Sequence, residues 1–232
     1  MKYTRLLLIR FSNNLSYEKI EYFRGAIVNA LKDKDILFHN HLTNGNGYRY
    51  SYPLIQYKRI NKQAAILCLA NGTEAIGKFF LDSNLTLTLN GETELFEVDN
   101  IRPHRQLIQI WDSKFQYRIR RWLPFNKHNY EQYNKLEGIV EQTAFLEKIL
   151  TNNILSFAKG LDIYFEKQVE CTITHLTDMR TSRYKGTLMS VFDAEFITNV
   201  SIPDFAGLGK GVSIGYGVTT RKREKQQNRN KI

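Results

Sequence analysis

The first hundred residues place strand-like and helix-like apolar patterns in an order that few folds can accommodate. Short apolar runs typical of strands occupy residues 3–11, 48–60, 64–70 and 85–98. Apolar residues at helical spacing lie between them, at 16–32 and from Gly72 onward. An Asn90-Gly91 pair is a strong two-residue hairpin signal, and it divides the last run into strands at 85–89 and 95–98. The sequence therefore predicts the order strand, helix, strand, strand, helix, strand.

That order is the split βαβ arrangement of a ferredoxin-like βαββαβ domain, which also underlies the common RNA-recognition module. A second set of patterns begins after Pro103. It comprises a hairpin at 106–111 and 115–123, a long helix at about 130–157, and strands at 163–174 and 183–200. We therefore predict an α+β fold with two tandem ferredoxin-like domains. The second is modified, because a glycine-rich segment stands where its second helix is expected.

The predicted domains span residues 1–100 and 101–220, and a basic tail at 221–232 is expected to be disordered. The chain has a formal net charge of +10, and the tail contributes half of it, with six basic residues against Glu224. A basic balance of this size favours a polyanionic partner.

The two cysteines, Cys68 and Cys171, lie apart in apolar strand-like runs and lack the spacing of metal ligands. This usage is typical of a reducing compartment and predicts a cytoplasmic protein. The longest apolar run near the start is Leu6 to Ile9, too short for a signal-peptide core. No run reaches the length of a membrane span, so no membrane partner is expected.

The segment from Gly207 to Gly217 holds five of the chain's 14 glycines. Glycine permits positive φ and close approach, so such a segment can present backbone amides to phosphate, with Lys210 adding a point charge. The segment does not match the sequence motifs of two familiar nucleotide-binding loops. The dinucleotide motif needs glycine where Val212 stands, and the Walker motif needs glycine at Asp204. A phosphate-binding loop and a plain flexible hairpin between two strands both remain open.

Two features together resemble a known family. Gly209, five residues and then Gly215-Tyr-Gly217 look like the hallmark loop of the repeat-associated mysterious protein superfamily, although Tyr216 replaces a frequent phenylalanine and Gly211 is an added glycine in the spacer. The stretch Phe38-His-Asn-His41, followed by Tyr48 to Lys58, is similar to the N-terminal region of the subtype I-B CRISPR repeat-processing endoribonucleases. The resemblance covers nearly the whole chain. It implies two ferredoxin-like domains and cleavage of precursor CRISPR RNA.

His39 and His41 are the candidate catalytic pair, because residues two apart in an extended segment project from one face. Cleavage without a metal needs a base for the ribose 2′-hydroxyl proton, an acid for the leaving 5′-oxygen, and positive charge near the phosphorus. Histidine suits the first two roles, while Tyr48 and Lys32 are candidates to orient and stabilise the phosphate. The resemblance implies products with 2′,3′-cyclic phosphate and 5′-hydroxyl ends. Neither a cofactor nor a metal is expected.

Two other interpretations stay open. An inactive RNA-binding subunit of a CRISPR effector complex would share the fold and bind RNA without cutting it. A more distant alternative is a two-histidine phosphoesterase, because His41-Leu-Thr43 and His175-Leu-Thr177 repeat its His-x-Thr pattern. That family expects an apolar residue after each threonine, whereas this chain has Asn44 and Asp178.

The predicted RNA-binding residues combine positive charge with aromatic rings or glycine backbone. They are Arg49, Tyr50, Lys58, Arg102, Arg105, Arg118, Arg120, Arg121, Gly207, Gly209, Lys210, Gly211, Gly215 and Gly217. In a strand at 115–123, alternation would place Arg118 and Arg120 on one face and Tyr117 and Ile119 on the other. The expected partner is CRISPR repeat RNA, as a stem-loop or unstructured. An effector complex and a homodimer are left open.

Overall fold

The computed structural model describes residues 3–30, 52–82 and 84–223 of the 232-residue chain. In the first half the elements are β1 (Tyr3–Asn14), α1 (Ile20–Ala30), β2 (Ile55–Ile60), β3 (Gln63–Leu69), α2 (Gly72–Asp82), β4 (Thr86–Leu89), β5 (Glu92–Leu95) and β6 (Val98–Leu107). In the second half they are β7 (Ile110–Trp122), α3 (Lys127–Tyr133), α4 (Ile139–Gly160), β8 (Cys171–Leu176), β9 (Arg180–Tyr184), β10 (Thr187–Val200) and β11 (Val218–Arg221). In these described ranges, no helix is both long and apolar enough to cross a membrane.

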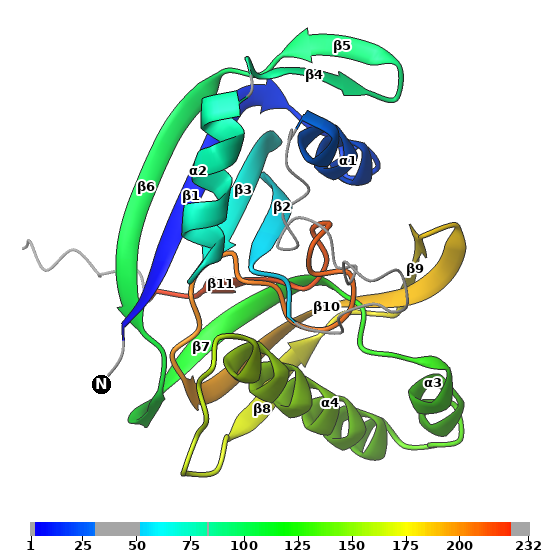
Figure 1. Cartoon of the computed structure of the whole chain (residues 1–232). Helices are drawn as coiled ribbons and strands as arrows, with labels where there is room; N and C mark the ends of the chain where they lie inside the picture. The colour runs from blue at the N-terminus through cyan, green and yellow to red at the C-terminus, as the bar shows by residue number, and fades with distance from the viewer. Residues whose placement is uncertain (1–2, 31–51, 83, 224–232) are drawn as a thin grey trace, which may run out of the picture.

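The first sheet has the antiparallel order β2-β3-β1-β6, which is the strand order of a ferredoxin-like domain. Helices α1 and α2 cover one of its faces (Figure 1). The predicted hairpin turn is confirmed, since Asn90 and Gly91 have φ of 51° and 86°. The predicted bounds of the partner strand, 95–98, are wrong. β5 pairs with β4 at 92–95, and the chain then starts a separate strand, β6, which pairs with β1.

The second sheet repeats the pattern, with order β11-β7-β10-β8 and α4 on one face (Figure 1). The predicted fold of two tandem ferredoxin-like domains is confirmed. Three details differ. β7 is one continuous strand where a hairpin was predicted at 106–111 and 115–123. The helix predicted at about 130–157 is divided, because α3 ends at Tyr133 and α4 begins at Ile139 after its N-cap Gly138. The expected strand at 163–174 begins only at Cys171.

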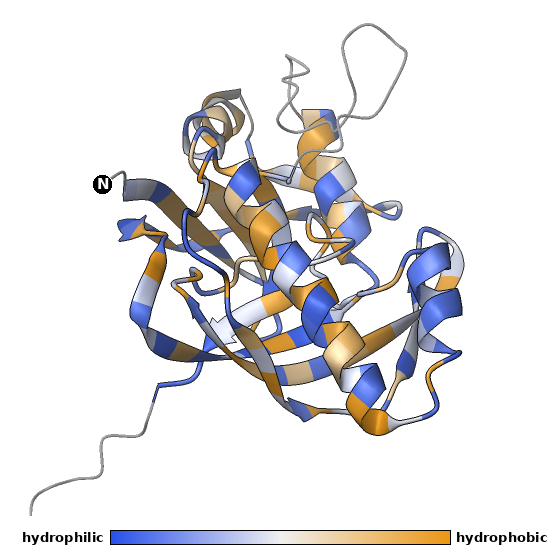
Figure 2. Cartoon of the chain, turned by 90° about the horizontal axis from the view of Figure 1, so that it is seen from below, coloured by the Kyte–Doolittle hydropathy of each residue, from blue (hydrophilic) through white to orange (hydrophobic). Residues whose placement is uncertain are grey.

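Buried apolar side chains form two clusters, and each includes residues of both domains. One of them joins Leu6 and Leu67 of the first sheet to Tyr117 and Ile119 of the second. Along α4, polar and apolar positions alternate (Figure 2), and its buried residues are Leu146, Ile149, Leu150, Ile154, Phe157 and Ala158. Burying each large apolar side chain stabilises the fold by about 1.5–3 kcal/mol. The domains are therefore packed as one body.

The glycine segment lies in this junction, between β2 and the second sheet (Figure 1). The Tyr57 amide donates to Ser213 O at 2.9 Å, and the Gly217 amide donates to Arg121 O at 3.0 Å. Gly217 has φ of 61°, and a Cβ at this position would overlap the carbonyl oxygen of Leu208. Only glycine allows this close approach of two backbone segments.

Replacing Gly217 with alanine is expected to lower the free energy of unfolding by at least about 2 kcal/mol, through the overlap with Leu208 and the positive φ. Gly77→Ala is the matched control, because a Cβ there meets nothing within 4 Å and the residue lies inside α2. It should stabilise the protein by about 0.5–1 kcal/mol. Urea unfolding of both variants measures the difference. Equal stability of the two would contradict the close-approach explanation.

Candidate nucleic-acid interface

The face of the second sheet opposite α4 carries the predicted basic residues. Tyr117 is 1% exposed and Ile119 is 0% exposed, so they lie on the core side of β7. Arg118 and Arg120 therefore lie on the opposite face, as strand alternation predicted. Glu195 on β10 is the cross-strand partner of Arg118, and it also pairs with His175 on β8. We call this surface the open face.

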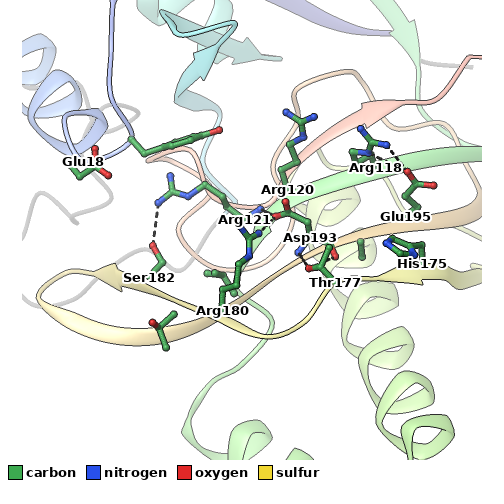
Figure 3. Close-up of a pocket in the computed structure, with 14 residues that line it drawn as sticks. Glu18, Arg118, Arg120, Arg121, His175, Thr177, Arg180, Ser182, Asp193 and Glu195 are labelled. Atoms are coloured by element: carbon green, nitrogen blue, oxygen red, sulfur yellow. Dashed lines mark hydrogen bonds and ion pairs between the residues drawn. The ribbon is translucent and has the colours of Figure 1, made fainter.

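A cavity of about 560 Å³ lies over the open face, bordered by the segment before α1 and by β9 and β10 (Figure 3). Its charged and titratable lining residues are Glu18, Arg118, Arg120, Arg121, His175, Arg180, Asp193 and Glu195. Four arginines against three carboxylates leave the cavity with an excess of positive charge. Such a surface can bind phosphate groups.

Most of the cations on the open face are paired with carboxylates. Glu195 accepts hydrogen bonds from Lys222 Nζ at 2.6 Å and from Arg118 Nη2 at 2.7 Å, and these bonds lower the pKa of Glu195 to about 2. Arg180 pairs with Asp193 at 2.8 Å. Arg120 is exposed and makes no ion pair with any residue in the described ranges. Arg120 is therefore the most available guanidinium of this surface.

Arg121 has a different position, because its guanidinium lies between two tyrosine rings. Its carbon Cζ is 4.2 Å from the ring centroids of both Tyr17 and Tyr216, and Nη2 donates to Ser182 Oγ at 3.3 Å. The backbone has φ of 51°, and its amide donates to Asp193 Oδ1 at 2.8 Å. Arg121 was predicted to bind RNA. In the structure it lines the cavity and joins the segment before α1, the glycine segment and the β9–β10 hairpin.

The glycine segment is mostly enclosed. Gly207, Gly215 and Gly217 are buried, whereas Gly209 and Gly211 are partly exposed and Lys210 is exposed. The Gly207 amide donates to Gln56 Oε1 at 3.1 Å, so this amide already has a partner within the protein. Direct contact of the three buried glycines with RNA, as expected from the sequence, does not fit their burial. The turn from 209 to 211 is the part that faces solvent.

Lys58 also departs from its predicted place on an RNA-binding surface. Its side chain is 0% exposed, and Nζ donates to the carbonyl oxygen of Val212 at 3.2 Å. The glycine segment covers strand β2. Both faces of this strand are therefore covered by protein, and buried side chains lie on both of them. Burial lowers the pKa of Lys58 to about 7. Lys58 therefore holds the glycine segment and does not reach bound RNA.

The remaining predicted residues fall into two groups. Lys32, His39, His41, Tyr48, Arg49 and Tyr50 lie outside the described residues. Just after them, Tyr52 donates its hydroxyl hydrogen to Gly207 O at 2.8 Å. Arg102 and Arg105 lie on the exposed edge strand β6 of the first sheet, and neither lines the cavity over the open face.

Sequence reasoning missed three residues of the open face. Arg180 and Lys222 were not proposed, and His175 was noted only as part of a His-x-Thr pattern. Arg180 reaches the cavity because β9 folds back along β10, a pairing that the expected single strand at 183–200 did not contain. Lys222 follows β11, and pairing of that strand with β7 brings it beside Glu195. Identifying Arg180 and Lys222 as residues of the open face would have required the correct pairing of β9 with β10 and of β11 with β7.

Comparison with known proteins assigns the family. A model of the Cas6b N-terminal domain matches residues 2–106, and a model of the Cas6b C-terminal domain matches residues 109–222. The chain belongs to the Cas6b family. The family predicted from the glycine segment and the paired histidines is confirmed. Since both halves match Cas6b, the two-histidine phosphoesterase alternative has no support.

One curated relative and several solved structures are similar to this chain. An uncharacterized protein of Methanocaldococcus jannaschii, MJ0978, is 36% identical over 139 residues, covering 59% of this chain and 93% of the relative. A crystal structure of Cas6b is similar with a TM-score of 0.86 and 25% identity, over 95% of this chain and all of that one. Another, described as the CRISPR RNA processing endoribonuclease Cas6b, has a TM-score of 0.74 and 22% identity, with the same coverage.

The buried Lys58 predicts how the stability of this Cas6b depends on pH. Its pKa in the folded chain, about 7, lies below the value of about 10.4 in an unfolded chain. Between these values the unfolded chain binds more protons, so the free energy of unfolding rises with pH. From pH 7 to pH 9 the rise should be about 2 kcal/mol larger in the natural protein than in Lys58→Met.

Urea unfolding at both pH values, followed by tryptophan fluorescence, gives this difference. The Lys58→Met variant controls for every other titrating group, because methionine fills similar space without a charge. If the free energies of unfolding of the two proteins change in parallel with pH, the ammonium group is not buried as described.

Proposed function

We propose that this Cas6b is an endoribonuclease that cleaves within the repeats of precursor CRISPR RNA without a metal ion. The observation that carries the proposal is the basic open face in a chain of this family. Its cavity holds an excess of arginine, and Arg120 is exposed there without an ion pair among the described residues. A solved Cas6b of the same fold is described as a CRISPR RNA processing endoribonuclease, which supports the same activity in this chain.

The proposed chemistry uses the paired histidines that the sequence offers. One of His39 and His41 takes the proton from the ribose 2′-hydroxyl, and the 2′-oxygen attacks the adjacent phosphorus. The bond from phosphorus to the 5′-oxygen breaks, and the other histidine supplies the proton to that oxygen. The products end in a 2′,3′-cyclic phosphate and a 5′-hydroxyl. Lys32 and Tyr48 are proposed to stabilise and orient the phosphate during this step.

The described residues are proposed to hold the RNA while this step takes place. Arg120 binds phosphate directly, since it has no carboxylate partner among the described residues to leave. Arg118 and Lys222 exchange their shared partner Glu195 for phosphate oxygens of the RNA. Both cations can form charge-assisted hydrogen bonds with these oxygens. Tyr52 fixes the end of the segment that carries the histidines to the glycine segment, through its bond to Gly207. Binding and chemistry thus come from different parts of the chain.

Cleavage of labelled repeat RNA in EDTA tests the chemistry. We expect the natural protein to cut at an unchanged rate in EDTA, and His39→Ala/His41→Ala to lose at least about a hundredfold in rate, because general acid and base catalysis are both removed. A 2′-deoxy substitution at the cut position should stop cleavage while leaving binding nearly intact.

His128→Ala is the matched control, since His128 is a histidine of α3 that does not line the cavity over the open face. It should cut normally. Loss of cleavage in EDTA, or normal cleavage by the double variant, would contradict the proposed mechanism. Tight binding without any cleavage by the natural protein would favour the inactive RNA-binding subunit instead.

Removal of the Glu195 charge tests the open face as the RNA-binding surface. Glu195→Gln should strengthen binding of repeat RNA by about threefold to tenfold at low salt, because Arg118 and Lys222 are released toward phosphate. Arg120→Ala should weaken binding. It should also lower the slope of log affinity against log salt concentration by about one, the amount expected for one lost phosphate contact. Filter binding over a range of salt concentrations measures both effects.

Glu92→Gln is the matched control for the added positive charge. Glu92 accepts from Lys19 at 2.7 Å in an exposed pair on β5, away from the cavity over the open face. Its replacement changes the net charge equally and should leave the affinity for RNA nearly unchanged. Equal gains from the two glutamine variants would mean that net charge, and not the open face, sets the affinity.

A further inference from the structure

A second cavity, of about 540 Å³, lies where β6 ends, β7 begins and β11 ends. The open face does not include it. Its lining residues combine three arginines with three aromatic rings: Arg105, Arg221, Arg223, Tyr3, Trp111 and Phe115. We call this cavity the flanking groove. Its residues come from both domains, so packing of the two sheets creates it.

The aromatic rings of the flanking groove are partly open to solvent, and contacts within the protein hold Trp111 and Phe115 in place. Tyr3 is 59% exposed and Trp111 is 38% exposed. The Trp111 indole donates from Nε1 to Ser201 Oγ at 2.9 Å, and its ring meets Phe115 edge-on at 6.3 Å between centroids. The guanidinium of Arg221 covers the Phe115 ring at 4.4 Å. These are fixed flat surfaces on which another ring can stack.

The charge of the flanking groove is positive and weakly balanced. Asp204 is its one carboxylate among the described lining residues, and its Oδ1 accepts from the Arg221 backbone amide at 2.6 Å. The pair between Arg223 and Asp204 is long, at 3.8 Å, and the Arg223 side chain is 82% exposed. Arg105 forms no ion pair with the residues that the structure describes. Two or more guanidinium groups are thus available to a phosphate backbone.

This combination selects the class of ligand. An acidic peptide would use the arginines but leave the rings without stacking partners. A nucleic-acid duplex would present phosphates but keep its bases stacked inside the helix. Unpaired RNA offers both phosphates and exposed base faces, and grooves that bind single strands combine positive charge with aromatic stacking.

The flanking groove is connected to the open face by three consecutive residues. Lys222 directs its ammonium to Glu195 on the open face, whereas Arg221 and Arg223 line the flanking groove. β11, whose last residue is Arg221, is only four residues long and forms the edge of the second sheet. An RNA strand that leaves the open face around this short edge therefore meets positive charge along its path.

We propose that the flanking groove binds unpaired nucleotides that adjoin the repeat sequence held on the open face. The proposal rests on the proposed function, because it assigns a second contact for the same RNA. Bases stack on Tyr3 and Trp111, and phosphates bind Arg105, Arg221 and Arg223. RNA with unpaired flanks then binds more tightly than the repeat alone, and the flanking groove supplies the difference.

Two RNAs and two variants test this. One RNA is the repeat alone, and the other adds about ten unpaired uridines at each end, within the span of a single-strand site. In the natural protein the added uridines should raise the affinity by about tenfold or more, since one stacked base contributes about 1–3 kcal/mol. Tyr3→Ala/Arg223→Ala should lose this gain and bind the repeat alone normally.

Tyr164→Ala/Lys159→Ala is the matched control, because it also removes one exposed tyrosine and one exposed cation, at sites outside both cavities. It should keep the gain. No gain from the uridines in the natural protein, or an equal loss of affinity for both RNAs in the groove variant, would overturn the proposal. Displacement of the uridine tail by poly-glutamate as readily as by oligouridine would also overturn it.

A second measurement does not depend on the folding of any variant. RNA with 4-thiouridine in its tails, irradiated on the natural protein, should crosslink to peptides containing Tyr3 or Trp111. Crosslinks confined to other peptides would contradict the flanking groove. The rate of cleavage of the repeat alone is recorded in parallel, and it should be unchanged in the groove variant. If the natural protein cuts neither RNA, the proposed function fails while the binding results still decide the flanking groove.

Discussion

The close approach of the glycine segment to β2 is the constraint on which the rest of this Cas6b depends. Gln56 and Lys58 reach the segment from β2, at Gly207 and Val212. Tyr52, which precedes β2, donates to the carbonyl oxygen of Gly207. A Cβ at Gly207 would lie 3.1 Å from Lys58 Nζ, and a Cβ at Gly215 would lie 2.7 Å from Ile20 Cδ1, so side chains at these two positions would press against the first domain. The spacing of the glycines is therefore first a requirement of domain packing. The turn at 209–211 remains partly exposed.

Arg121 extends this packing to the open face. Its carbonyl oxygen accepts the amide of Gly217, its own amide binds Asp193, and its guanidinium lies between Tyr17 and Tyr216. The sparsely populated positive φ of Arg121 costs free energy, which these contacts offset. The arginine whose guanidinium lies between two tyrosine rings thus fixes the relative positions of the elements that carry the others.

The sequence predicted the fold class because each domain repeats an order of apolar patterns that has few solutions. It also predicted the two faces of β7, where alternation separates Tyr117 from Arg118. It did not predict that Lys58 would be buried, because a lysine beside aromatic residues looks like a surface residue until the glycine segment is placed over it. The β9–β10 pairing was missed for a similar reason. Burial and pairing depend on contacts between distant segments, which local patterns do not contain.

The carboxylates of the open face follow from the sheet that carries it. Arginines on adjacent strands of an antiparallel sheet would repel one another if no acid lay between them. Glu195 between Arg118 and Lys222, and Asp193 beside Arg180, remove that repulsion in the free protein. The pKa of about 2 means that Glu195 stays ionised at any physiological pH, so only a competing anion can release its partners. A surface built this way folds stably without RNA, and it favours ligands whose phosphates are dense enough to replace the carboxylates.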